Sequence, residues 1–335
     1  MSTIIVPEAV EAESTRWLTP QQRYIPMLAT FSLLFAMFTI GSLRYENFGQ
    51  PQVLLDVLID NSFLLVVAVG MTFVILTGGI DLSVGSVVAL STVLSASLLE
   101  KHHWNPILVM VVVLLMGVLL GAAMGVMIHY FEVQPFIATL AGMFLARGLC
   151  YVVSVDSISI NNGFYTDLAQ TKIPLLGGLS VNPSVLIALV VVAVGAYVLH
   201  LTRFGRTVYA VGGNQQSALL MGLPVGKVRV SVYAISGFCS ALGGILYTLY
   251  TLSGYSLNGV GMELDVIAAV VIGGTVLTGG SGYIFGTVLG VMVLGLIQTL
   301  ISFDGTLSSW WTKIFVGTVL FVFILLQRLI SVRKI

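Results

Sequence analysis

Ten apolar runs, each close to the length of a membrane-spanning helix, dominate this chain. They lie at about 25–43, 57–76, 83–99, 106–129, 135–153, 183–201, 231–252, 264–277, 283–301 and 311–330. A helix needs about 20 apolar residues to cross a bilayer, and backbone surrounded by lipid must satisfy its own hydrogen bonds. The runs are continuous and lack the alternation of barrel strands. The sequence therefore predicts an all-α, polytopic integral membrane protein with about ten transmembrane helices.

Charged side chains are too scarce to cover a water-facing surface. They make up 8% of the 335 residues, against about 25% in soluble domains, and hydrophobic residues make up 57%. The ten runs leave only short connections, so no second, soluble domain is expected. With 14 basic and 14 acidic residues the net charge is zero, and no basic surface suggests a nucleic acid partner.

Lysine and arginine are concentrated on one side of the predicted spans, which the positive-inside rule assigns to the cytoplasm. The connection 202–230 carries four of them and no acid, and both tails carry further arginines. We therefore expect residues 1–24 and 331–335 to be cytoplasmic tails. Residues 25–330 would form a single transmembrane domain, with 202–230 as its cytoplasmic loop. No cleavable signal is visible before the first run, which is expected to stay as an uncleaved anchor.

The cytoplasmic loop contains the signals of a short helix. Asn214 suits the N-cap, Gly222 suits the left-handed position after the last turn, and Pro224 prevents continuation. The helix would present apolar side chains that are unsuited to free solvent, with Ala218, Leu219, Leu220 and Met221 among its residues. The pattern favours a docking helix for a cytoplasmic partner. The alternative is an amphipathic helix that lies on the lipid surface.

A second motif, Gly78-Gly79-Ile-Asp81-Leu-Ser83, interrupts the apolar pattern between two predicted spans. The two glycines would end one helix, and Asp81 or Ser83 would cap the next one. A helix start at membrane depth exposes N–H groups that can meet polar substrate atoms. The simpler interpretation makes Asp81 only an N-cap at the cytoplasmic boundary.

Other glycines and acids mark the second half of the chain. Gly273 and Gly274 permit a bend or a close helix approach, and Glu263, Asp265 and Asp304 lie on the side opposite the cytoplasm. Two stripes of glycines at intervals of four are typical of tightly packed helices in lipid. The stripes are Gly117, Gly121 and Gly125, and Gly282, Gly286 and Gly290.

The sequence Leu-Thr-Gly-Gly occurs twice, at 76–79 and 277–280, and in each copy another glycine follows six residues later. Transporter halves often keep such weak internal symmetry, with broken helices at corresponding places. Coincidence in a glycine-rich, apolar chain explains the repeat equally well.

No catalytic constellation, cofactor motif or metal ligand set is apparent. The segment Gly222–Val228 resembles a phosphate loop, but its glycine spacing is one residue short and no Ser or Thr follows Lys227. A secondary transporter driven by an ion gradient would be expected to keep acids or histidines in mid-span, and Asp81 is the only acid near such a place. An intramembrane enzyme acting on a lipid-linked sugar would need a cluster of polar catalytic groups.

Three segments together resemble the permease subunits of bacterial ribose-type sugar ABC importers. They are the 78–86 motif, Gly213-Asn214 with Ala218 and Gly222, and the run from Glu263 to Thr275. The similarity extends over about residues 60–330. Within this group of importers, the stretch Ile301–Lys313 resembles in particular a permease of galactofuranose importers.

This resemblance implies a multi-pass inner-membrane permease that forms half of a translocation path for a sugar. It implies a cytoplasmic ATPase, a second permease protomer and a periplasmic sugar-binding protein as partners. The coupling contact with the ATPase would be made by Asn214, Ala218, Leu219, Met221 and Gly222. Gly78, Gly79, Asp81, Ser83, Gly273 and Gly274 would serve gating or the path, and Glu263, Asp265 and Asp304 would face the binding protein. Many importers carry Glu-Ala-Ala where this chain has Gln216-Ser217-Ala218, which removes any contact that needs the glutamate.

Overall fold

A computed structural model describes residues 25–308 and 310–332. For Leu176 and residues 328–332 it describes the backbone but not the side chains. The predicted tail 1–24 and residues 333–335 lie outside the described residues. The helices are α2 (Ile25–Arg44), α3 (Pro51–Asp60), α4 (Ser62–Leu76), α5 (Val84–Glu100), α6 (Pro106–Tyr130), α7 (Pro135–Val153), α8 (Gly163–Gln170), α9 (Pro183–Leu201), α10 (Arg203–Gly213), α11 (Gln215–Leu220), α12 (Val225–Thr251), α13 (Met262–Ile272), α14 (Ile284–Asp304) and α15 (Trp310–Val332). A 3-10 turn lies at Leu176–Gly178.

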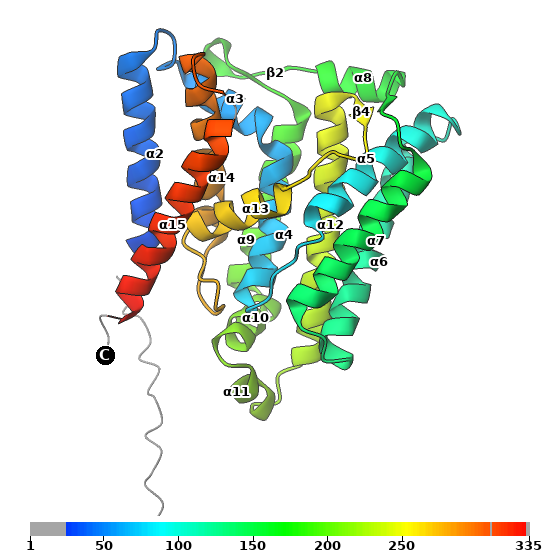
Figure 1. Cartoon of the computed structure of the whole chain (residues 1–335), viewed down its shortest axis with the longest axis vertical. Helices are drawn as coiled ribbons and strands as arrows, with labels where there is room; N and C mark the ends of the chain where they lie inside the picture. Colours follow the sequence, from blue (N-terminus) through cyan, green and yellow to red (C-terminus); the bar gives the residue numbers. More distant parts are fainter. Residues whose placement is uncertain (1–24, 309, 333–335) are drawn as a thin grey trace, which may run out of the picture.

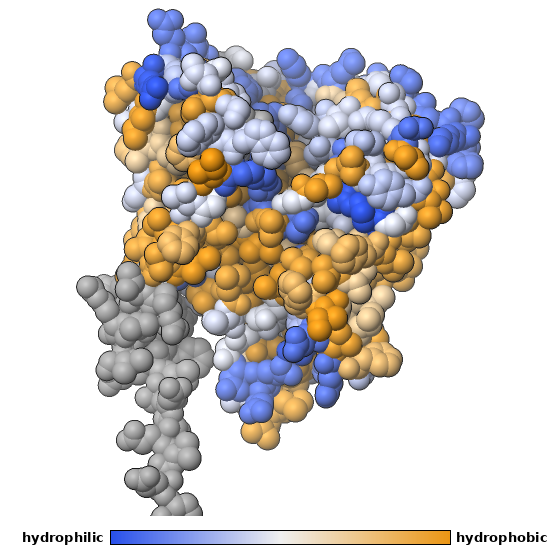
Figure 2. Space-filling view, viewed as in Figure 1, coloured by the Kyte–Doolittle hydropathy of each residue, from blue (hydrophilic) through white to orange (hydrophobic). Residues whose placement is uncertain are grey.

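The long helices stand side by side in one bundle, with α11 at one end and α3 and the strands near the other (Figure 1). The strands are two-residue pieces that pair antiparallel: β1 (Ile158–Ser159) with β4 (Ser253–Gly254), and β2 (Ile173–Pro174) with β3 (Ser180–Val181). On the face that Figure 2 shows, a broad hydrophobic band crosses the middle of the bundle, and polar residues gather towards both ends. The predicted all-α membrane fold is confirmed.

Each of the ten predicted runs contains a helix, but not all of these helices are long enough to cross a membrane. Among the described residues, seven helices are long and apolar enough, or eight if α3 and α4 form one span bent by 64°. The helices α5 and α13 have 17 and 11 residues. Ten crossings, and cytoplasmic placement of both termini, therefore stay predictions.

Helix starts follow local sequence signals. The helices α6, α7 and α9 each begin with a proline, whose missing N–H costs nothing in the first turn. At α6 the side chain of Asn105 also accepts a hydrogen bond from the backbone N–H of Ile107 at 2.9 Å. These signals explain why the predicted runs and the observed helices share their boundaries so closely.

Helix α12 lies at the centre of the bundle, packed against α4, α5 and α6. The predicted glycine stripe of α6 faces it. A methyl group on Gly121 would overlap the backbone carbonyl of Tyr233, and one on Gly117 would overlap that of Gly237. On the second stripe, a methyl group on Gly290 would overlap the carbonyl of Ala269 in α13. Small residues thus let these backbones touch, as both stripes predicted.

We predict that Gly121→Leu destabilises the protein by about 1–3 kcal/mol, because the α6–α12 contact has no room for a side chain. The melting midpoint of the purified chain in detergent measures the effect. The control is Gly148→Leu in α7, an exposed position at which a methyl group meets no atom within 4 Å. Equal midpoints for the two variants would contradict the packing argument.

Candidate functional site

Between α4 and α5 the chain is not helical, and Figure 1 shows this segment turning back from the α11 end into the bundle. Gly78 has a φ of 76°, a conformation that favours glycine. The segment leads to Asp81, whose side chain is fully buried. The short length of α5 follows from this geometry, because the helix begins inside the bundle rather than at its end.

The Asp81 carboxylate binds three donors. One oxygen accepts from the backbone N–H of Ser83 at 3.0 Å and from its hydroxyl at 2.6 Å, and the other accepts from the hydroxyl of Ser236 at 2.7 Å. Neither ion pair of the described residues includes Asp81. Ser236 is the twelfth residue of α12, about 16 Å along the helix from its start. The N-cap residue of α5 is Ser83, whose side chain makes no cap bond, and Asp81 lies just before it and accepts from its N–H and hydroxyl. The bond to Ser236 places Asp81 deeper in the bundle than the predicted boundary position.

At the α11 end, three backbone segments meet through glycines. The N–H of Gly280 donates to the carbonyl of Leu76 at 2.9 Å, and a methyl group on Gly212, near the end of α10, would overlap the same carbonyl. A methyl group on Gly279 would lie 2.7 Å from the N–H nitrogen of Gly78. The two Leu-Thr-Gly-Gly copies thus touch each other and the helix before α11. We call this contact the glycine junction.

The predicted short helix of the cytoplasmic loop is present as α11. The side chain of Asn214 accepts from the N–H of Ser217 at 2.8 Å, and Gly222 has a φ of 73°. Leu219, Leu220 and Met221 are 64%, 89% and 67% exposed, so α11 projects an apolar surface. Ala218, expected to take part in docking, is fully buried and lies beneath that surface.

The sequence interpretation missed the helix that carries α11. It treated 202–213 as a connection, whereas these residues form the N-cap and helix α10. The hydroxyl of Thr202 accepts from the N–H of Gly205 at 3.2 Å and so caps the first turn. Because α10 ends at the glycine junction, it links α11 mechanically to both broken segments.

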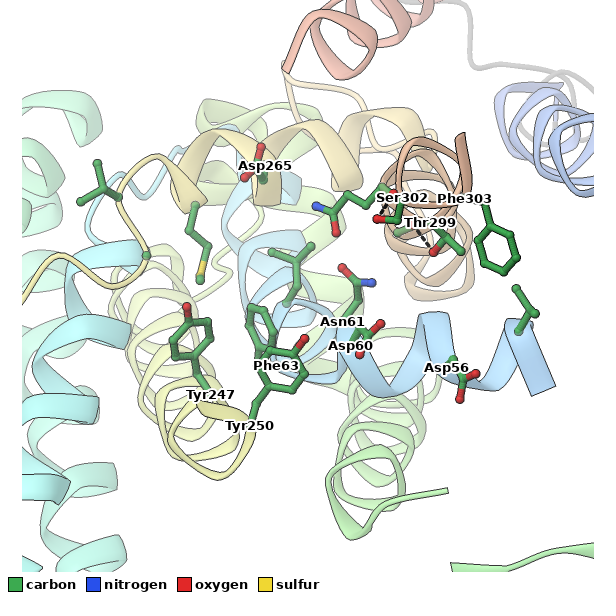
Figure 3. Close-up of a pocket in the computed structure, with 17 residues that line it drawn as sticks. Asp56, Asp60, Asn61, Phe63, Tyr247, Tyr250, Asp265, Thr299, Ser302 and Phe303 are labelled. Carbon is green, nitrogen blue, oxygen red and sulfur yellow. Dashed lines mark hydrogen bonds between the residues drawn. The ribbon is translucent and has the colours of Figure 1, made fainter. Parts of the chain in front are cut away.

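A cavity of about 700 Å³ opens at the other end of the bundle, between α3, α4, α12, α13 and α14. We call it the outer pocket (Figure 3). One wall is aromatic: Phe63 and Tyr247 meet edge to face at 4.8 Å between ring centroids, and Tyr250 lies 6.0 Å from Phe63. This wall offers both flat apolar faces and phenolic hydroxyls.

Carboxylate, amide and hydroxyl groups supply the polar part of the outer pocket. They belong to Asp56, Asp60, Asn61, Asp265, Gln298, Thr299 and Ser302. The amide of Gln52 donates to Asp56 at 2.8 Å, and the amide of Asn61 donates to the carbonyl of Val57 at 2.9 Å. Aromatic faces beside many hydrogen-bonding oxygens suit a small molecule with several hydroxyls and apolar C–H faces.

The three outer acids that the sequence singled out lie in different environments. Asp265 lines the outer pocket and pairs with Lys313 at 2.7 Å. Glu263 lies against the start of α5, where a methyl group on Gly85 would lie 2.5 Å from its carboxylate. Asp304 pairs with Arg44 at 3.3 Å and accepts from the hydroxyl of Tyr45 at 2.8 Å.

The bond to Asp304 raises the pKa of the Tyr45 phenol above its usual range. Contact of the three acids with a partner stays a prediction.

Gly273 and Gly274 lie at the end of α13, away from the outer pocket. A methyl group on Gly273 would overlap the carbonyl of Gly286 in α14, and Gly274, with a φ of 93°, packs against Pro26. The structure therefore shows a packing role for them, and their part in gating remains a prediction.

The pocket-lining residues of α3, α4 and α12 were not identified from the sequence. Asp56 and Asp60 did carry a signal, since acids next to apolar spans are costly and often functional. Tyr247 and Tyr250 gave no sequence signal of a functional role, because aromatic residues are common in membrane-spanning helices. Only the packing of α12 against α4 brings them opposite Phe63.

Comparison with known proteins gives one family and a set of relatives. Residues 53–324 match the family described as branched-chain amino acid transport system / permease component. The chain is 46% identical to the inner membrane ABC transporter permease protein YjfF of Escherichia coli, over 93% of this chain and 94% of that one. It is 42% identical to the fructose import permease protein FruG of Bifidobacterium longum, over 92% of each chain. It is 39% identical to the ribose import permease protein RbsC of Haemophilus influenzae, over 93% and 96%. No solved structure matches the chain.

We predict that Asp81→Ala lowers the melting midpoint more than Ser236→Ala does. The first change leaves three donors without their acceptor, and an unpaired buried polar group costs about 1–3 kcal/mol, whereas the second removes one bond. The control is Asp156→Ala, an exposed acid in the connection between α7 and β1. A wild-type midpoint for Asp81→Ala would show that these bonds do not stabilise the fold.

Proposed function

Because the chain belongs to the branched-chain amino acid transport system / permease component family, and within it to the ribose-type carbohydrate ABC importer permeases, we propose that it forms half of the path of a galactofuranose importer. The protein is a multi-pass inner-membrane permease that imports a sugar, not an enzyme. An ATPase and a periplasmic binding protein are its partners. Membership of this family leaves no support for a secondary transporter or an intramembrane enzyme.

The main support for the proposed sugar path is the outer pocket. It lies at the end of the bundle opposite α11, so a sugar released by the binding protein would enter there. Tyr250 and Tyr247 would contact the C–H face of the sugar ring, and Asp60 would accept hydrogen bonds from its hydroxyls. Such contacts are individually weak, which suits a path that must release its substrate again.

Galactofuranose, or a closely related monosaccharide, is the proposed substrate because Ile301–Lys313 is similar to the same stretch of galactofuranose importer permeases. Relatives named for fructose and ribose support a monosaccharide of this size. A second permease protomer would supply the other half of the path. In galactofuranose importers that protomer is a different chain, and we extend this arrangement to the present protein.

Uptake by proteoliposomes tests this proposal. The chain would be purified with its ATPase, second permease and binding protein, and labelled galactofuranose or ribose would be supplied with and without ATP. We expect ATP-dependent uptake with a preference for galactofuranose. We also expect Tyr250→Ala to reduce uptake at low sugar concentration about fivefold, the effect of losing one aromatic contact.

Tyr151→Ala, which removes an exposed tyrosine of α7, is the matched control and should leave uptake unchanged. A preference for ribose would overturn the proposed sugar. Full uptake by Tyr250→Ala would remove the outer pocket from the path.

For coupling, the chain of contacts begins at α11. We propose that the exposed Leu219 and Met221 bind the ATPase, with Asn214 and Gly222 holding the ends of the helix. Motion of α11 would reach the glycine junction through α10. It would reach the Asp81–Ser236 bond through α12, which is separated from α11 by four residues. Both routes end at the segment between α4 and α5, which would change its position between inward- and outward-facing states.

Gly222→Pro tests the coupling route. Proline fixes φ near −65° and cannot adopt the 73° of this residue, so the end of α11 must change. We expect ATP-driven uptake to fall at least about tenfold while membrane insertion and sugar preference stay normal. Gly222→Asn is the control, because asparagine tolerates the left-handed conformation and the position has open space around it. Normal uptake by the proline variant would refute the assignment.

A further inference from the structure

A second cavity, of about 690 Å³, lies between α10 and the first turns of α12. We call it the basic groove. Its floor and walls are mainly apolar and include Phe204, Leu223 and Val228. Three cationic residues also line it: Arg203 and Arg206 from α10, and Lys227 from α12. The groove is separate from the outer pocket, which lies at the opposite end of the bundle and shares none of its lining residues.

The charge of the groove is uncompensated. No acidic residue lines it, and neither ion pair among the described residues involves its three cations. All three residues are exposed. By contrast, Arg229, the remaining base of the loop, donates to the side chain of Gln215 at 2.5 Å. The groove therefore combines an apolar interior with three cations available to an anion.

These cations lie at the level where a spanning helix leaves the membrane. Thr202 is the only residue between α9, which is long enough to span, and Arg203 at the start of α10. Lys227 is the third residue of α12, another spanning helix. The exposed helix α11 lies beyond this level, at the end of the bundle (Figure 1). Cations at a helix end on the cytoplasmic side meet the phosphate layer of an anionic leaflet.

We propose that the basic groove binds an anionic phospholipid of the cytoplasmic leaflet. The lipid phosphate would bind Arg203, Arg206 and Lys227, and an acyl chain would lie against Phe204 and Val228. The apolar lining favours a lipid over an acidic protein surface, which would leave that lining unused. Since α10 forms one wall of the groove and also ends at the glycine junction, a bound lipid would hold the segment that carries α11.

Native mass spectrometry of the full-length chain measures this binding. The probes are phosphatidylglycerol and phosphatidylcholine with identical acyl chains, added to delipidated protein. We expect the wild type to bind phosphatidylglycerol more tightly. Each Lys or Arg near an anionic lipid contributes about fivefold, so R203Q/R206Q should lose roughly 25-fold of that preference. Excess inorganic phosphate should not displace the lipid, because the acyl chain contributes to binding.

The matched control is K101Q/K172Q, which removes the same charge from two exposed lysines on the outer side. It should keep the wild-type preference. Lys227→Gln, with an expected loss of about fivefold, provides a second test should the double variant be poorly folded.

Three results would overturn the proposal. One is equal binding of both lipids by the wild type, and another is an unchanged preference in R203Q/R206Q and Lys227→Gln. The third is displacement by inorganic phosphate, which would identify a simple anion site. If the wild type lacks a lipid preference and R203Q/R206Q instead loses binding of the purified ATPase, the groove belongs to the ATPase interface.

Discussion

The fold depends on one constraint: backbone inside a membrane must find its hydrogen-bond partners within the protein. Continuous helices meet this constraint automatically. Among the described residues, two non-helical segments within the bundle need other partners. The first, between α4 and α5, is held by the hydroxyls and backbone around Asp81. The second, between α13 and α14, meets the first where the N–H of Gly280 donates to the carbonyl of Leu76. Each of these two non-helical segments thus finds hydrogen-bond partners in another part of the chain.

This arrangement places the elements that we propose to move next to each other. Helix α10 ends at the same contact that joins both non-helical segments, and the glycines there leave no room for side chains. A displacement of α10 cannot be absorbed by side-chain rearrangement, because the contact is made of backbone. Helix α4 ends at this contact with Leu76 and lines the outer pocket with Phe63, so this one helix connects the two ends of the bundle.

The sequence was sufficient for features that depend on local chemistry. Asn214 and Gly222 defined α11 to within one residue, because caps act on their own helix. The apolar runs located the long helices because the hydropathy of a span is also a property of its own residues. Features that depend on tertiary packing were not accessible. The aromatic wall needs α12 to lie beside α4, the depth of Asp81 needs α5 to begin inside the bundle, and α10 has too few apolar residues to resemble a span.

The partners of Asp81 also bear on how the bundle can switch. A buried carboxylate paired with an arginine would be costly to separate, since each charge would be left without its partner. Here the carboxylate is held by hydroxyls and one backbone N–H. Two of its three bonds come from Ser83, close by in the same segment, and would move with it. The bond to Ser236 crosses to α12, and so does the bond that the Tyr233 hydroxyl donates to the carbonyl of Ile80 at 3.4 Å. The segment between α4 and α5 is therefore tied to α12 by two hydroxyl donors and no ion pair. Separating such hydrogen bonds costs less than separating a buried ion pair, which is compatible with the movement proposed for this segment.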